Sequence, residues 1–164
     1  MSGIIRSVIL SLAVLVLLAS CGGKKTVIYT GKAYPPTSKV DYAFMASQVP
    51  PSCRVFAQVL VTLPANSTGK TIRDSITDEA RMRGADMILI GQSRQMKEDE
   101  GLNFVYYGPE REYLCNEQWC GWKYGYDVWE KQGDWVNIGF KEWGNDRIRF
   151  DYPIMLQAAF LRCR

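Results

Sequence analysis

The middle of the chain switches from a strand-like to a helix-like hydrophobic pattern and back. Apolar residues alternate along 54–63 (RVFAQVLVTL), a β-branched run typical of a strand. Over 68–83 the apolar residues recur every four positions, which predicts a helix with one buried stripe. The stripe residues are Ile72, Ile76 and Ala80. The apolar run 87–91 (MILIG) predicts a strand buried on both faces. Together these segments predict a βαβ unit with parallel strands and a right-handed crossover.

Aromatic residues dominate the second half of the chain. All five Trp, six of the nine Tyr and three of the six Phe lie within 102–152, interspersed with Gly. We predict strands there, broken by Gly-containing turns, at 102–107, 122–129 and 135–140, with a hairpin turn at 132–134. The last strands are expected at 148–152 and 154–162, separated at Pro153. The predicted fold class is therefore α+β, a mixed β-sheet with a βαβ crossover helix (about 68–83) and an aromatic-rich β extension.

The N-terminus carries the pattern of a secretory signal. Arg6 precedes an apolar run at 7–18 (SVILSLAVLVLL), which has the length of a signal h-region and is shorter than the ~20 residues that span a bilayer. The following Leu18-Ala19-Ser20-Cys21 resembles the bacterial lipobox, in which the Cys thiol is acylated and the Cys becomes the new N-terminus. We therefore expect lipidation at Cys21.

This motif divides the chain into three parts. Residues 1–20 are the expected signal peptide, which is removed, and 21–52 are the lipidated N-terminus and a Pro-containing tether. Residues 53–164 are expected to form a single α+β domain. Alternating apolar residues near the end of the tether are compatible with a short edge strand, at Val40, Tyr42 and Phe44.

The amino-acid composition excludes several kinds of catalytic and binding chemistry. The chain contains no His, which excludes His-based general bases, catalytic dyads and imidazole metal ligands. Removal of the signal would leave 19 basic against 17 acidic residues, so charge gives no case for nucleic acid. No nucleophile paired with a base stands out. We expect a protein that is not an enzyme and has no cofactor.

Four cysteines remain beside Cys21, an even number that predicts two disulfides in an oxidising compartment. Cys115 and Cys120 are spaced to close a tight loop. Cys53 begins the first core strand and Cys163 ends the last, so antiparallel pairing of these strands would bring them together. We predict Cys53–Cys163 and Cys115–Cys120. The alternative is a zinc site, but the C-x4-C spacing has no second matching pair.

Two further motifs suggest ligands but are incomplete. The segment 67–71 (STGKT) looks like the end of a P-loop, yet the full pattern needs Gly where Pro64 stands, and Pro has no amide hydrogen for a phosphate. The acidic segment 97–101 (KEDEG) lacks the alternating oxygen ligands of an EF-hand loop. We expect neither nucleotide nor calcium binding.

Residues 34–94 resemble a known group of bacterial proteins. Tyr34-Pro35-Pro36-Thr37 precedes the first core strand, and 81–86 (RMRGAD) leads directly from the helix into 87–91. This arrangement resembles small envelope proteins with a YbjQ-like α/β unit, a group that includes the outer-membrane lipoprotein that senses envelope stress for the Rcs phosphorelay. The resemblance implies a compact βαβ-containing domain and, by comparison with the Rcs sensor, disulfides and a Pro-containing tether. The aromatic segment 95–152 has no counterpart in that sensor, so its partners do not carry over.

These observations predict an outer-membrane lipoprotein that faces the periplasm, with the cell surface as the alternative face. Gly22 follows the lipidated Cys, where an Asp would resemble an inner-membrane retention signal. The leading hypothesis is a non-enzymatic interaction or sensing module whose 102–152 surface contacts an envelope protein. The alternative is a peptidoglycan- or glycan-binding lipoprotein that uses exposed Trp residues. A hydrolase would need two carboxylates facing each other across a cleft, and its candidates are Glu110, Glu112 and Glu117.

Overall fold

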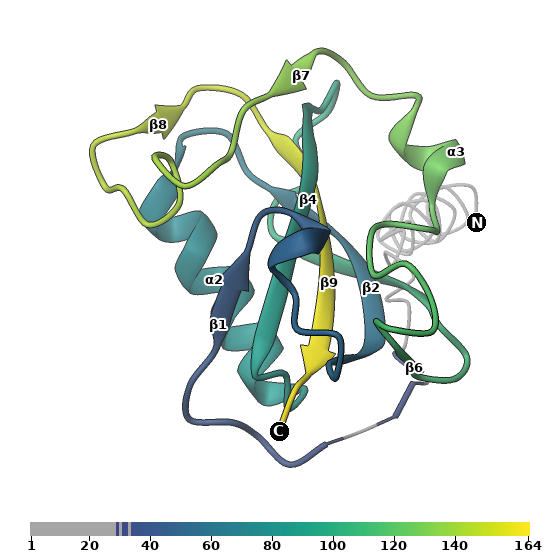
Figure 1. The fold of residues 1–164 in the computed structure, drawn as a ribbon. Coiled ribbons are helices and arrows are strands. Elements are labelled where there is room, and N and C mark those ends of the chain that lie inside the picture. The colour runs from purple at the N-terminus through teal and green to yellow at the C-terminus, as the bar shows by residue number, and fades with distance from the viewer. Residues whose placement is uncertain (1–28, 30, 33) are drawn as a thin grey trace, which may run out of the picture.

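A mixed β-sheet forms the centre of the fold in the computed structural model, which describes residues 29, 31–32 and 34–164 (Figure 1). Its main strands lie in the order β1–β4–β9–β2–β5. Their bounds are Asp41–Ala43 (β1), Met87–Gln95 (β4), Ile154–Arg162 (β9), Arg54–Leu63 (β2) and Asn103–Gly108 (β5). Strand β9 is antiparallel to both β2 and β4, so β2 and β4 run parallel to each other. The predicted parallel pair is present, but the last strand of the chain lies between its members.

Helix α2 (Gly69–Met82) connects β2 to β4. The Thr68 side chain caps it, since its Oγ1 accepts a hydrogen bond from the Thr71 amide at 3.1 Å. The predicted apolar stripe of the helix is buried against the sheet. Gly84 follows the helix with φ +83°, a left-handed conformation that favours glycine. The helix and its boundaries therefore follow the sequence prediction closely.

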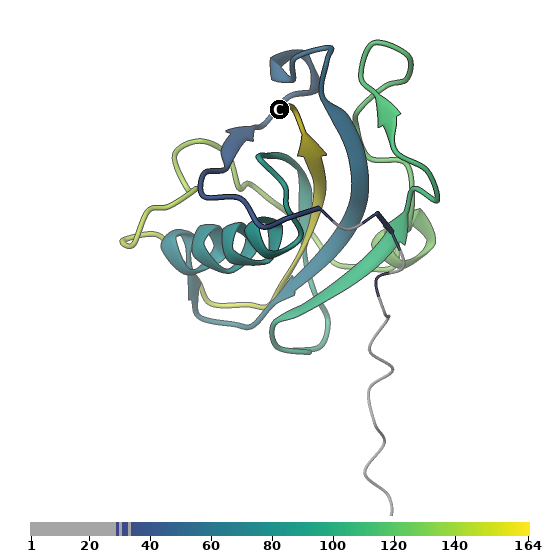
Figure 2. The same ribbon diagram turned by 90° about the horizontal axis from the view of Figure 1, so that it is seen from below.

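The two faces of the sheet are covered by different parts of the chain. Side chains of Ile154, Leu156, Ala158 and Phe160 lie in the same core cluster as the α2 stripe. Between them, the alternate β9 residues point to the opposite face, because side chains alternate along a strand. On that face Met155 packs with Trp122 and Trp129 from the aromatic segment. Figure 2 shows α2 on one side of β2 and β9, with the segment that carries β6 on the other. We call the face opposite α2 the aromatic face.

The folded part begins before residue 53, where the domain boundary was expected. Strand β1 pairs in parallel with β4, and the short 3-10 helix η1 (Ala46–Gln48) follows it. Val40, Ala43 and Val49 are buried, and the Thr37 amide donates to the Arg81 carbonyl at 3.2 Å. Residues 34–52 therefore belong to the domain, because their apolar side chains complete its core. The expected edge strand is present.

The aromatic segment contains less strand than its sequence predicted. The 102–107 strand is present as β5, but 122–129 is a loop that ends in a short helix, α3 (Tyr126–Trp129). Gly125 before this helix has φ +69°, which interrupts an extended chain. The 135–140 strand is reduced to β7 (Trp135–Val136), which pairs with β4, so 132–134 does not join a hairpin. The short strands β6 (Tyr113–Leu114), β3 (Ser67–Thr68) and β8 (Arg149–Phe150) complete the fold.

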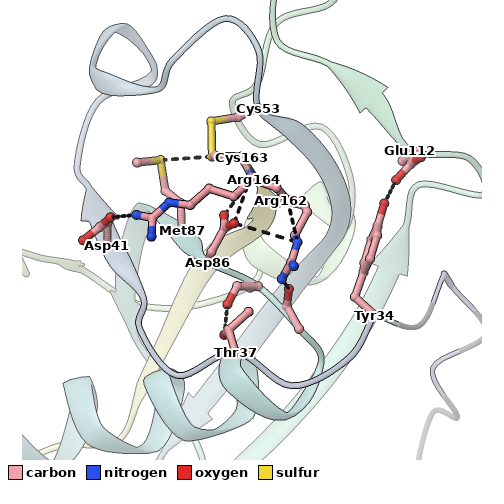
Figure 3. Close-up of polar contacts among 12 residues, drawn as sticks. Tyr34, Thr37, Asp41, Cys53, Asp86, Met87, Glu112, Arg162, Cys163 and Arg164 are labelled. Carbon is pink, nitrogen blue, oxygen red and sulfur yellow. Dashed lines mark hydrogen bonds and ion pairs between the residues drawn. A yellow bond between two sulfur atoms is a disulfide. The ribbon is translucent and has the colours of Figure 1, made fainter.

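Both predicted disulfides are present. Arg54 pairs with Arg162 in the antiparallel β2–β9 ladder, and this register places the neighbouring Cys53 and Cys163 together (Figure 3). The second disulfide, Cys115–Cys120, closes the loop after β6.

The expected lipidation site Cys21 and the signal peptide 1–20 lie outside the described residues. In the part of the chain that is described, no helix has both the length and the apolar character needed to cross a membrane.

Candidate functional site

Two adjoining hollows lie over the middle of strand β4. The first has a volume of about 230 Å³ and extends onto the aromatic face, where Trp119, Trp122 and Tyr126 form one wall. The second has a volume of about 450 Å³ and lies between the end of β1 and the chain from Trp135 to Gly139. Both hollows share four lining residues, Phe44, Ile90, Gly91 and Gln92. We call the combined depression the β4 groove.

Strand β4 has an unpaired stretch of backbone at this groove. One edge of the strand pairs with β9, and the other edge pairs with β1 at 87–89 and with β7 at 93–94. The three residues Ile90–Gln92 lie between these two contacts and pair with neither strand. In Figure 1, β1 lies beside the lower part of β4 and β7 beside its upper end. The register with β9 also shifts between Ile90 and Ser93, and Gly91 and Gln92 are exposed.

Two buried donors without an acceptor line the groove, and two others contact residues that line it. Among the described residues, four buried side-chain polar atoms have no hydrogen-bond partner, and all four are N–H donors. They are Arg94 Nε, Trp122 Nε1, Trp143 Nε1 and Gln157 Nε2. Trp122 and Gln157 line the first hollow, Arg94 stacks on Trp135 of the second, and Trp143 packs against Phe44. Because buried polar groups in native proteins are nearly always paired, this cluster calls for an explanation.

Gln157 differs from the other buried glutamine on the same face. The Gln58 amide is fully paired, since its Nε2 donates to the Tyr113 hydroxyl (3.2 Å) and the Gly121 carbonyl (3.0 Å) and its Oε1 accepts from the Lys123 amide (2.8 Å). Gln157 Oε1 accepts only from the Gln92 amide at 3.3 Å. That contact requires an oxygen at this position and so fixes the orientation of the amide. The Gln157 NH₂ group is left at the floor of the groove, although the residue is only 2% exposed.

The rim of the groove carries exposed aromatic rings. These are Trp119 (62% exposed), Tyr126 (44%), Trp135 (60%) and Phe140 (87%). Phe140 contacts Phe44 edge to face at a centroid distance of 6.3 Å. The Arg94 guanidinium lies 4.4 Å from the Trp135 ring centroid and 5.5 Å from that of Trp129. It forms no ion pair with any described residue, and the ring faces of Trp135 and Trp129 are the aromatic contacts of its charge.

The three glutamates considered for a hydrolase do not line the β4 groove. Glu110 lines a separate hollow of about 180 Å³ beside Tyr29 and Tyr106. Glu112 accepts hydrogen bonds from the Tyr34 hydroxyl and from Lys32 Nζ (2.8 Å), and it lies 3.6 Å from Arg54 (Figure 3 shows the Tyr34 contact). Partial burial pushes the Glu112 pKa upward, but these hydrogen bonds and cationic charges outweigh it and hold the pKa below its ordinary value.

The P-loop-like segment is occupied by the protein itself. The amides of Gly69 and Lys70 donate to the carbonyls of Ile148 (3.0 Å) and Asn145 (3.2 Å). A side chain at Gly69 would collide with the carbonyl of Glu142, so the loop lies directly on the helix N-terminus. These amides already have acceptors and are not free to hold a phosphate. The described residues also contain no group of three or more Cys, Asp or Glu side chains placed to hold a metal ion.

Sequence patterns did not identify the groove. The aromatic segment was singled out, and it does supply Trp119, Trp122 and Trp135. The unpaired edge at Ile90–Gln92 and the free donor of Gln157 depend on long-range pairing. The sequence offered one signal for the groove, Gln157 within the apolar run of the last strand (IMLQAAFLR). A polar side chain in such a run is expected to be buried and therefore needs a hydrogen-bond partner.

No protein-family model matches this chain, and no curated protein and no solved structure is significantly similar to it.

Proposed function

We propose that this protein is a lipid-anchored, non-enzymatic interaction or sensing module of the bacterial cell envelope, and that its β4 groove binds a protein partner. The observation that carries the proposal is that two buried N–H donors without an acceptor, on Trp122 and Gln157, line one groove. Such donors are costly when buried without an acceptor, and a bound partner that offers oxygen atoms removes this cost.

The first hollow and the rim of the groove favour a protein partner. Small-molecule pockets commonly occupy about 300–1,000 Å³ and enclose most of their ligand. The first hollow is smaller, at about 230 Å³, and suits a single anchoring side chain, whereas the second, at about 450 Å³, falls within this range. Exposed aromatic rings next to a pocket are typical of residues that dominate protein–protein binding energy. Trp119, Trp135 and Phe140 are such residues here.

The N-terminal sequence supports the location. The lipobox-like Leu18-Ala19-Ser20-Cys21 is the basis for a lipid anchor, and Gly22 after it favours transfer to the outer membrane. Two disulfides suit an oxidising compartment such as the periplasm. The resemblance of 34–94 to YbjQ-like envelope proteins agrees with this location and with a sensing role.

Photo-crosslinking in living cells tests the proposal. Probe residues placed at Trp119, Trp135 or Phe140 should each capture the same discrete protein. A probe at Met82, which is 62% exposed on α2, should not capture it. The substitution Gln157→Met in the same probe strains should weaken the adduct. Equal adducts from Met82, or adducts that do not change with Gln157→Met, would show that the groove is not the interaction site.

Glycan binding is a second candidate, because Trp119 and Trp135 each expose more than half of their surface and flat rings of this kind can stack on sugars. In a sedimentation assay with purified peptidoglycan, a glycan binder would pellet with the cell wall and lose this behaviour on Trp119→Ala with Trp135→Ala. The protein-binding proposal predicts that the full-length protein remains in the supernatant once its lipid anchor is held in detergent.

A further inference from the structure

We infer that the β4 groove binds its partner as an extended peptide segment, which adds a short strand to the free edge of Ile90–Gln92. This inference rests on the proposed interaction function and specifies how that interaction is made. Addition of a peptide strand to an open sheet edge is a common mode of recognition, in which main-chain hydrogen bonds give affinity and side-chain pockets give specificity.

The free edge has the dimensions of a short strand. Three residues at about 3.3 Å each make roughly 10 Å of backbone between the ends of β1 and β7. Both flanking strands pair with the same edge of β4, so this edge already has the direction and twist that a ladder needs. Gly91 has no side chain, so its exposed surface is main chain that an incoming peptide can reach, whereas the Gln92 amide already donates to Gln157 Oε1.

Glycine is required at the centre of this edge. A Cβ built on Gly91 would lie 2.8 Å from Cβ of Gln157, closer than real side chains approach. The absence of a side chain lets the β4 backbone lie directly over Gln157. It also leaves the aromatic side of the groove open beside the free edge.

The first hollow would receive one side chain of the peptide. Side chains of an added strand alternate, so those of one set point toward the aromatic face. There the hollow is lined by Leu89 and Ala159 and walled by Trp119 and Trp122, an apolar setting for a bulky side chain. The Gln157 Nε2 and Trp122 Nε1 groups are shielded from solvent here, so they pair with carbonyl oxygens of the peptide only after their side chains shift.

A cation lies beside the Trp135 end of the groove, although it lines neither hollow. Arg94 points to the aromatic face with Met155, its neighbour in the ladder, and stacks on Trp135. Its guanidinium has no carboxylate partner among the described residues, and its buried Nε is unpaired. The expected peptide therefore carries a bulky apolar residue and, a few positions away, an Asp or Glu.

A library of displayed random peptides, selected for binding to the full-length protein in lipid nanodiscs, provides the probe. Random eight-residue peptides should be enriched for a bulky apolar residue at a fixed spacing from an acidic one. The best peptide is then N-methylated at one backbone position at a time, and its Kd is measured by calorimetry. Strand addition predicts at least tenfold weaker binding at every second position of the bound core and little change at the positions between.

Variants of the protein test the named contacts. Gln157→Met is nearly isosteric and should weaken the selected peptide about five- to tenfold through loss of one hydrogen-bond donor. Arg94→Met should remove the preference for the acidic residue, while Met82→Ala on α2 should change nothing. No enriched sequence, tolerance of N-methylation at every position, or competition by peptidoglycan fragments would each overturn strand addition. If the in-cell crosslinks from the rim persist despite such a result, the interaction function stands and only its peptide mode is wrong.

Discussion

Two glutamines on the aromatic face differ in how many of their polar atoms the fold pairs. Gln58 and Gln157 are both fully buried and lie on neighbouring strands. Gln58 holds the loop that carries Gly121 and Lys123, and each of its polar atoms has a partner. Gln157 keeps an unpaired NH₂ group at the floor of the groove. A buried polar atom that the fold does not pair is expected to bond a water molecule or a ligand atom.

The two positions should therefore respond differently to the same substitution. Gln58→Met leaves the Lys123 amide and the Gly121 carbonyl without their partner, and it should lower the free energy of unfolding by about 2–3 kcal/mol. Gln157→Met loses only the 3.3 Å contact with the Gln92 amide and removes an unpaired donor, so its effect should stay within about 1 kcal/mol. Urea unfolding of both variants measures the difference. Equal destabilisation would mean that the Gln157 amide is part of the structural network.

At the scale of elements, hydrophobic periodicity correctly predicted the strand and the helix whose formation depends on local interactions. The strand β2 and the helix α2 follow their hydrophobic periodicity, and the cap and stop residues of the helix are encoded beside it. The predicted strand at 122–129 is wrong, because Trp122 and Trp129 are buried by packing across the aromatic face and Gly125 interrupts the extended chain. Aromatic residues that favour strands also favour such packing, so composition alone cannot separate the two.

The β4 groove was beyond sequence prediction for a different reason. The apolar run 87–91 indicated a strand, but the strand continues through polar residues to Gln95 because β9 and β7 pair with it there. The gap at Ile90–Gln92 exists because β1 ends and β7 begins at particular positions. These are consequences of pairing between segments 41 to 46 residues apart, which no local pattern contains.

Gly84 lies between α2 and β4 and packs against residues 34–35, so its replacement should reveal how much this contact contributes to stability. Gly84→Ala places a side chain at φ +83° and against Tyr34 and the carbonyl of Pro35. Gly101 is the matched control, because it has φ +71° but no atom within 4 Å of an added Cβ. Gly101→Ala should lower the free energy of unfolding by about 1 kcal/mol from backbone strain alone, and Gly84→Ala by clearly more. Similar losses in denaturant unfolding would show that residues 34–35 do not pack against the end of α2.

At the scale of the whole molecule, the N-terminal segment and the C-terminus meet at one end of the sheet. Arg164 forms an ion pair with Asp41 at 2.7 Å, and Asp86 accepts from the amides of Cys163 (2.7 Å) and Arg164 (3.1 Å) (Figure 3). The Cys53–Cys163 disulfide lies beside this network. The segment that would lead from the proposed membrane anchor is thus attached to the domain close to Cys163 and Arg164.

The two disulfides should contribute unequally to stability. Cys53 and Cys163 are 110 positions apart, whereas Cys115 and Cys120 are 5 apart. In the chain-entropy model these loops correspond to roughly 5 and roughly 2 kcal/mol. Replacement of both members of each pair by Ala, followed by thermal unfolding, should show the larger fall in Tm for Cys53→Ala with Cys163→Ala. A larger fall for the other pair would mean that the loop after β6 limits stability.

Attachment of the N-terminal segment should depend on pH through Glu112. Lys32, Tyr34 and Arg54 surround its carboxylate and hold its pKa below the ordinary value of 4.5. A carboxyl whose pKa is lowered by folding stabilises the folded state above its ordinary pKa, and this contribution is lost as the pH falls through the lowered value. The free energy of unfolding of the native protein should therefore exceed that of Glu112→Gln at pH 7, and the difference should disappear below the lowered pKa. Asp41 and Asp74 also have lowered pKa values, but they titrate in both proteins, so the comparison isolates Glu112. A difference that stays constant from pH 7 to pH 2 would mean that Glu112 holds Tyr34 by hydrogen bonding that does not require its charge.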